Sequence, residues 1–209
     1  MGERRVSRWL SSNPAVRLGA PVAAVALGIS GLFGGLAPQP LADRVDSVQP
    51  DAEVTVEPFK LRIKQAVVVD EIADVVKART PGSHLMVVRL EAANVSSESL
   101  GSQLLMPVSR ARSYLSRNLV VLDDRLVPTA ASVYDADSDV QVSLLSPGLT
   151  YRLAVVWEFG GPVPQRLPLG LSELTLRGDV ISAEDLRWQD PKEAATLTLP
   201  VRDATGEPA

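Results

Sequence analysis

The chain has no cysteine and only one histidine, His84, and this composition excludes several kinds of chemistry. Without cysteine it can form no disulfide, no thiolate metal site, no cysteine nucleophile and no cysteine-linked lipid anchor. A Ser–His–Asp triad would have to use His84, which follows the turn residues Pro81-Gly82-Ser83, and no G-x-S-x-G nucleophile motif occurs in the chain. We therefore expect this protein not to be an enzyme, and we expect no cofactor.

An excess of positive charge is also lacking over most of the chain. Residues 1–42 carry four arginines and one glutamate, net +3, whereas residues 43–209 carry 17 basic and 24 acidic side chains, net −7. A domain with this negative charge would repel phosphate backbones, so nucleic acid is not an expected partner. The short basic segment at the N-terminus is the pattern that keeps such a segment in the cytoplasm.

One long uncharged segment, residues 18–37, follows this basic tail. Twenty residues at 1.5 Å per residue span about 30 Å, the thickness of a membrane's hydrocarbon core. The segment therefore predicts one N-terminal transmembrane helix that acts as a signal anchor, with the rest of the chain outside the cytoplasm. Gly28, Gly31 and Gly35 would lie on roughly one face of that helix, which predicts a contact with another membrane helix.

A cleaved signal peptide is the alternative for the same segment. Gly35-Leu36-Ala37 has the small-x-small pattern of a cleavage site, although Pro38 follows it directly. Pro40-Leu41-Ala42 before Asp43 is a second candidate. The uncharged segment exceeds the 7–15 residues of a usual signal peptide, which favours the anchor.

Composition divides the chain into five parts. The parts are a cytoplasmic basic tail (1–17), the transmembrane anchor (18–37), a proline-rich tether (38–53), an extracytoplasmic β-sandwich (54–202) and a disordered tail (203–209). The tether contains Pro38, Pro40 and Pro50 and has no hydrophobic period, so it is expected to be extended.

The domain after residue 54 consists of short runs with β-type alternation between turn signals. Tyr151–Phe159 is the strongest, with apolar residues at every second position, and Phe59–Val69 alternates at its start. The other expected strands are residues 84–94, 103–106, 118–122, 125–127, 140–145, 173–176 and 196–199. Helical turns are expected only at 72–77 and 182–188. This pattern predicts an all-β fold, an antiparallel immunoglobulin-like β-sandwich.

Residues 54–165 resemble the telokin-like immunoglobulin-type domains of unknown function on bacterial anchored proteins and lipoproteins. The matching pieces are the basic alternating strand Phe59–Val69, the strand Val87–Ser97 that ends in an Asn-plus-small turn, and the corner at Leu122-Asp123-Asp124. Leu145-Ser146-Pro147-Gly148-Leu149-Thr150, which enters the strand Val155–Phe159, completes the match. The resemblance implies a sandwich and transfers no catalytic residue. This chain departs from it by lacking the lipid-anchor cysteine and by continuing past residue 170.

Three carboxylates, Asp135, Asp137 and Asp139, have the spacing that opens an EF-hand loop. An EF-hand also needs glycine at its sixth position and glutamate at its twelfth, but Val140 and Ser146 stand there, so this motif is excluded. A looser Ca²⁺ site in a sandwich loop stays open beside a solvated acidic loop.

The strand Tyr151–Phe159 carries the other candidate side chains. Alternation places Tyr151, Trp157 and Phe159 on one face, which favours the core over an exposed aromatic strip. It places Glu158 on the opposite face, toward solvent. Trp188 stands in a polar context (DLRWQD) and would mark an interaction surface if exposed.

Taken together, the sequence predicts a single-pass protein of the bacterial cell membrane. Its domain outside the cytoplasm is expected to bind or scaffold another protein in a membrane or envelope complex. The alternative is an envelope sensor or enzyme that binds a small ligand or Ca²⁺ through acidic loops of the sandwich.

Overall fold

The computed structural model describes residues 45–72, 76–178 and 185–206, and the fold concerns these residues. Val45–Ala209 forms one compact unit. Within the described residues no helix has the length and apolar character needed to cross a membrane. The predicted anchor, residues 18–37, with Gly28, Gly31 and Gly35, lies outside the described residues.

The described residues contain fourteen strands and three short 3₁₀ helices. The strands are β1 (Asp46–Ser47), β2 (Glu53–Val56), β3 (Phe59–Val69), β4 (Glu71–Ile72), β5 (Val76–Lys77), β6 (Ser83–Asn94), β7 (Leu100–Gly101), β8 (Val108–Ser109), β9 (Leu119–Val121), β10 (Ala131–Asp135), β11 (Leu144–Leu145), β12 (Thr150–Gly160), β13 (Arg166–Gly178) and β14 (Leu186–Asp203). The helices are η1 (Ser102–Leu105), η2 (Arg110–Arg112) and η3 (Asp124–Leu126).

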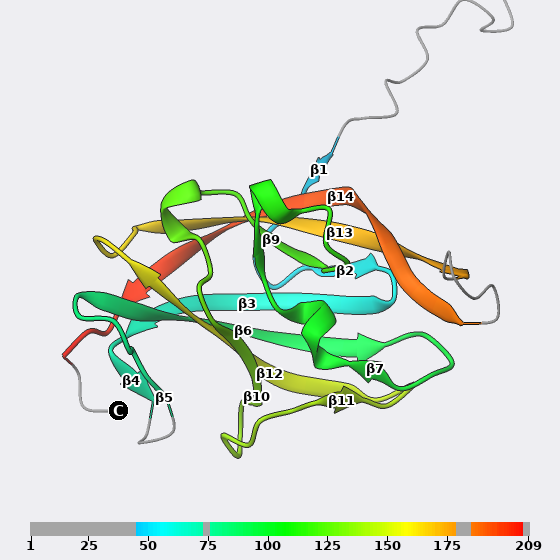
Figure 1. The fold of residues 1–209 in the computed structure, drawn as a ribbon, viewed down its shortest axis with the longest axis horizontal. Coiled ribbons are helices and arrows are strands. Elements are labelled where there is room, and N and C mark those ends of the chain that lie inside the picture. The colour runs from blue at the N-terminus through cyan, green and yellow to red at the C-terminus, as the bar shows by residue number, and fades with distance from the viewer. Residues whose placement is uncertain (1–44, 73–75, 179–184, 207–209) are drawn as a thin grey trace, which may run out of the picture. The chain divides into compact units, whose positions relative to one another are not determined.

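Ten of these strands form one curled sheet that folds into two layers (Figure 1). The β3 layer has the order β10-β12-β6-β3, with β2 added beside β3. The β13 layer has the order β14-β13-β9-β8, with β1 added beside β14. The protein is thus a β-sandwich, as the sequence predicts, although nothing in its topology confirms the telokin-like immunoglobulin type.

Strand β14 joins the two layers. It pairs antiparallel with β13 from Leu186 to Pro200 and then parallel with β3 from Val201 to Asp203. Parallel pairs also join β1 to β14 and β8 to β9, so the sandwich is mixed rather than purely antiparallel. The two late strands are much longer than the predicted 173–176 and 196–199, because they pair with each other along nearly their whole length and β14 also pairs with β1 and β3.

The space between the layers is filled by side chains at alternating strand positions. Leu153, Val155, Trp157 and Phe159 of β12 are buried there, as predicted, and Tyr151 packs at the edge of the same core. On β3 a bulge between Ile63 and Gln65 shifts the alternation by one residue. The alternation predicted from Phe59 to Ile63 is therefore confirmed, and beyond the bulge the strand presents the opposite set of positions.

Four predicted elements are wrong. The described residues of the range 72–77 are not helical: Glu71–Ile72 and Val76–Lys77 pair as β4 and β5, because the β-branched side chains of Ile72 and Val76 pack on the outer face of the β3 layer. Residues 103–106 and 125–127 are replaced by η1 and η3. In η1 the consecutive Leu104 and Leu105 are both buried, which one face of a strand cannot achieve. The described part of 182–188 belongs to β14.

Part of the predicted tether belongs to the sandwich. Asp46 and Ser47 form β1 beside Ala195 and Thr196 of β14, and Glu53 opens β2 beside Arg62. The described sandwich thus begins before residue 54. It also extends to Asp203, one residue into the predicted tail.

Candidate binding surfaces

The outer face of the β3 layer carries a trough whose floor is apolar. Strand register places Val67, Val87 and Val156 side by side across β3, β6 and β12. Ala154 lies beside this row, and Val69 extends it along β3. Leu85, Val87 and Val156 form a second hydrophobic cluster, separate from the main core. At the end of the β3 layer that carries the trough, both faces of the sheet are therefore apolar.

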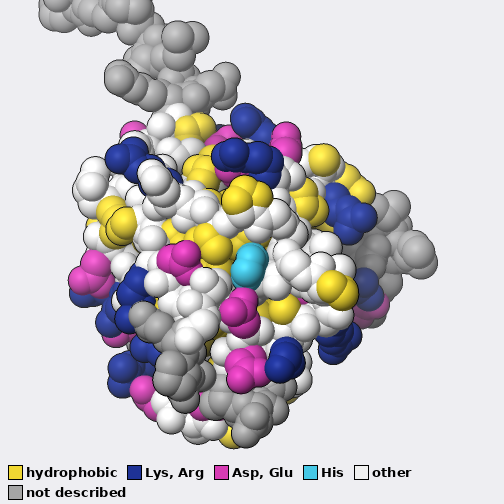
Figure 2. Space-filling model, turned by 90° about the vertical axis from the view of Figure 1, so that its left-hand side faces the viewer, with side chains coloured by type: hydrophobic (Ala, Val, Ile, Leu, Met, Phe, Trp, Pro, Cys, Tyr) yellow, Lys and Arg dark blue, Asp and Glu magenta, His cyan; other side chains and the backbone are white. Residues whose placement is uncertain are grey.

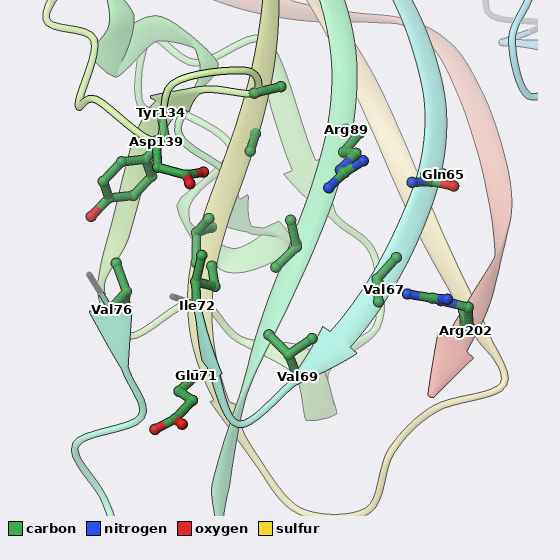
Figure 3. Close-up of a pocket in the computed structure, with 14 residues that line it drawn as sticks. Gln65, Val67, Val69, Glu71, Ile72, Val76, Arg89, Tyr134, Asp139 and Arg202 are labelled. Carbon is green, nitrogen blue, oxygen red and sulfur yellow. The ribbon is translucent and has the colours of Figure 1, made fainter. Parts of the chain in front are cut away.

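The β4–β5 hairpin forms one wall of the trough. Ile72 and Val76 pack against the second cluster and face the floor (Figure 3). The cavity between wall and floor has a volume of about 310 Å³. This is at the lower end of the range for small-molecule sites, which are usually mostly apolar with a few polar groups.

Two arginines, Arg89 and Arg202, stand on the side of the trough away from the hairpin (Figure 3). Arg89 lies beside Gln65 in the strand register, and Arg202 lies beside Val67. Neither arginine forms a hydrogen bond or ion pair with any residue that the structure describes. Both are exposed, so substitution at either position should leave the fold intact.

Other cations on the same outer face are paired with acids. Lys60 contacts Glu53 at 3.2 Å and Arg152 contacts Asp137 at 3.0 Å. Lys64 contacts Glu91, and this hydrogen bond is the main cause of the lowered pKa of Glu91. Arg89 and Arg202, at the trough, thus differ from these cations, because neither has an acidic partner among the described residues.

The opposite rim carries Tyr134 and Asp139 (Figure 3). Asp139 has a φ of +55°, which turns the chain back between β10 and the residue Gln141 that bridges to Tyr134. Its carboxylate has no partner among the described side chains. The trough therefore has a cationic side and a weakly anionic side.

The three aspartates of the DADSD loop do not converge. Asp135 accepts hydrogen bonds from the backbone N–H groups of Asp137 and Ser138 and from the Ser138 hydroxyl, and these contacts lower its pKa. Asp137 pairs with Arg152, whereas Asp139 faces the trough. Among residues 45–72, 76–178 and 185–206 no group of three metal-ligating side chains is found.

Glu158 has the face that alternation predicts but not the exposure. It is only 7% exposed, because the loop between β5 and β6 covers it. Its carboxylate accepts hydrogen bonds from the Ser83 hydroxyl and from the Thr80 backbone N–H at 2.9 Å, and these bonds lower its pKa to about 2. Glu158 thus fastens the loop that leads from the hairpin wall into β6.

The single histidine is paired with an acid at the surface. His84 Nδ1 lies 2.8 Å from Asp70 Oδ1, and the ring is in tilted contact with Phe159 at 6.0 Å. Figure 2 shows this histidine among hydrophobic and acidic side chains, with both signs of charge spread over the face. Among the described residues no serine or threonine hydroxyl is bonded to the ring.

A second apolar surface lies on the far parts of β13 and β14. Leu176 is the register partner of Trp188, and Leu186 follows on the same face of this two-stranded arm. Leu176 is 41% and Leu186 54% exposed, while Trp188 is half-buried against the core. In Figure 1 the arm projects at the end of the unit opposite to β4 and β5.

Pattern reasoning on the sequence missed the trough. Its floor comes from strands far apart in the chain, so no local motif contains it. One signal is present: Val67-Val68-Val69, Val87-Val88 and Val155-Val156 are consecutive apolar pairs within strands. Such pairs indicate strands that are covered on both faces.

The comparisons with known proteins give a fold likeness only. No family model and no curated protein matches the chain. An uncharacterised β-sandwich protein from Clostridium difficile is 9% identical with a TM-score of 0.45, covering 78% of this chain and 99% of its own. A candidate lipoprotein from Staphylococcus aureus is 14% identical with a TM-score of 0.38, covering 77% and 99%. With TM-scores below 0.5, neither structure bears on function.

Proposed function

We propose that the protein is an envelope binding protein, held in the membrane by residues 18–37, whose sandwich outside the cytoplasm joins a protein partner in a membrane or envelope complex. The telokin-like immunoglobulin type and the lack of enzymatic activity belong to this proposal. The observation that carries it is the exposed apolar face of the β13–β14 arm, formed by Leu176, Leu186 and Trp188.

The arm favours a protein partner for two reasons. A two-stranded ribbon is marginally stable in water, so an apolar ribbon face that extends beyond the sandwich gains stability when another surface covers it. Tryptophan is also among the residues that contribute most of the affinity at protein interfaces, and Trp188 lies on this face. Arg177, which alternation places on the opposite face of the ribbon from Leu176, is paired with Asp190 at 2.8 Å.

Photocrosslinking in intact membranes tests this proposal. A photoreactive residue at Leu186 of the full chain should crosslink to one protein species, and the same residue at the exposed Lys77 of β5, at the opposite end of the unit in Figure 1, should not. Adding Leu176→Ser should weaken the crosslink from position 186 at least fivefold while circular dichroism confirms the fold. A crosslink from position 186 no stronger than that from position 77 refutes the proposal. A product of twice the chain mass identifies the partner as a second copy.

The anchor has its own test. Mass spectrometry of the mature protein should recover an N-terminus that precedes residue 18. A mature chain that starts at Pro38 or Asp43 would show that the segment is a cleaved signal peptide.

A further inference from the structure

We propose that the trough on the outer face of the β3 layer is a second binding site, specific for a small amphiphilic anion. An aliphatic chain would lie on the valine floor, and a carboxylate or phosphate head group would lie between Arg89 and Arg202. This site is distinct from the β13–β14 arm and is independent of any protein partner.

The charge pattern identifies the head group. Arg89 and Arg202 stand on β6 and β14, the two neighbours of β3, and are offset by two residues in the register. Strand spacing puts their Cα atoms about 12 Å apart, a gap that two long arginine side chains can close around one anion. Guanidinium groups bind carboxylate and phosphate through paired hydrogen bonds. Neither arginine has a partner of its own among the described residues.

The floor and wall identify the rest of the ligand. Val67, Val87 and Val156 are nearly covered, and Ile72 and Val76 stand over them, so an aliphatic chain would be sandwiched between floor and hairpin. The cavity of about 310 Å³ suits a chain of medium length better than a full phospholipid tail. Each buried methylene should raise the affinity about fourfold.

Asp139 and Tyr134 on the opposite rim set the orientation. The carboxylate of Asp139 repels an anion, so the head group should lie on the arginine side. A cationic amphiphile of equal length would meet two arginines and is expected to be rejected.

Fluorescence titration of the full chain in zwitterionic lipid nanodiscs provides the test. Because the chain has no cysteine, Ala136→Cys at the rim can carry a single polarity-sensitive fluorophore. Octanoate should bind about sixteenfold more tightly than hexanoate, and octylamine should bind at least tenfold more weakly than octanoate. The same fluorophore at Ala111→Cys, on η2 of the other layer, should not respond.

Three variants make the test specific. Arg89→Gln and Arg202→Gln should each weaken octanoate binding at least fivefold, whereas Arg112→Gln, an exposed arginine on η2, should not. Ala154→Leu should weaken it by filling the floor. Equal binding of octanoate and octylamine, or unchanged binding by both arginine variants, would overturn the proposal.

A competition experiment in the same nanodiscs distinguishes the possible sources of the anion. Two competitors of octanoate are tested: octyl phosphate, which is added in solution, and phosphatidylglycerol, which is incorporated in the nanodisc. Competition by phosphatidylglycerol assigns the site to a membrane lipid, and competition by octyl phosphate alone assigns it to a free amphiphile. Leu176→Ser should change none of these affinities, so failure of the protein-partner proposal and failure of this one are distinguishable.

Discussion

Replacement of Glu158 by glutamine is expected to reveal how the loop beside the trough is held. In the folded protein its carboxylate accepts hydrogen bonds from Thr80 and Ser83, which lower its pKa from 4.5 to about 2. Because the folded-state pKa is depressed, the stabilisation is complete above the unfolded pKa and is lost as the pH falls through the folded one. The pH window for this loss runs from about 4.5 down to about 2.

The size of the effect follows from the shift. The whole shift corresponds to about 3 kcal/mol. We expect about 2 kcal/mol, because solvent beside the loop screens the charge and because glutamine still accepts one hydrogen bond. At pH 2.5 only about a quarter of this stabilisation remains, so the unfolding free energies of wild type and variant should then differ by about 0.5 kcal/mol.

Urea denaturation of a fragment that begins at Val45, the start of the compact unit, measures this difference. Unfolding is followed by the fluorescence of the buried Trp157 at pH 7 and pH 2.5. Glu98→Gln, at an exposed glutamate whose side chain forms no hydrogen bond or ion pair with any described residue, is the matched control and should change neither value. A Glu158→Gln penalty that is equal at both pH values would refute the reasoning, because it would not depend on the carboxylate's charge.

Four further predictions follow from buried or rim side chains. Asn118→Ala should lower the unfolding free energy by about 3 kcal/mol in urea, since its Nδ2 donates to Val56, Glu57 and Ser172 carbonyls. Trp157→Phe should cost under about 1.5 kcal/mol in the same assay, because the buried indole N–H has no partner in the described structure. Asp139→Asn should raise octanoate affinity about threefold at low salt and less at high salt, in the nanodisc titration. Calcium at 5 mM should shift the melting temperature by less than about 1 °C, because the aspartates of the DADSD loop diverge.

Much of the sandwich could be predicted because strand alternation is a local signal. Tyr151–Phe159 and Phe59–Ile63 show their buried faces directly in the sequence. The length of β14 could not be predicted in this way. Its pairing with β1 and β3 joins segments more than a hundred residues apart, and no periodicity records such partners.

The exposure of Glu158 illustrates a second limit. Alternation assigns a face, but burial depends on what covers that face. Here the loop at Thr80 and Ser83 folds over it, and a carboxylate predicted to lie in solvent becomes an anchor for backbone and hydroxyl donors. The β4–β5 hairpin could not be predicted for the same reason. Ile72 and Val76 pack on an apolar surface that exists only in the folded sheet.

The outer face of the β3 layer differs between its two halves, and this difference bears on function. In one half lysine and arginine neutralise Glu53, Glu91 and Asp137, an arrangement that suits a solvated surface. In the other half two arginines without an acidic partner among the described residues border an apolar floor, and their like charges repel in the isolated domain. A ligand with an acidic head removes this cost, and its aliphatic body would lie on the valine floor. The arm lies at the opposite end of the unit in Figure 1, so a protein partner there would leave the trough open to its ligand.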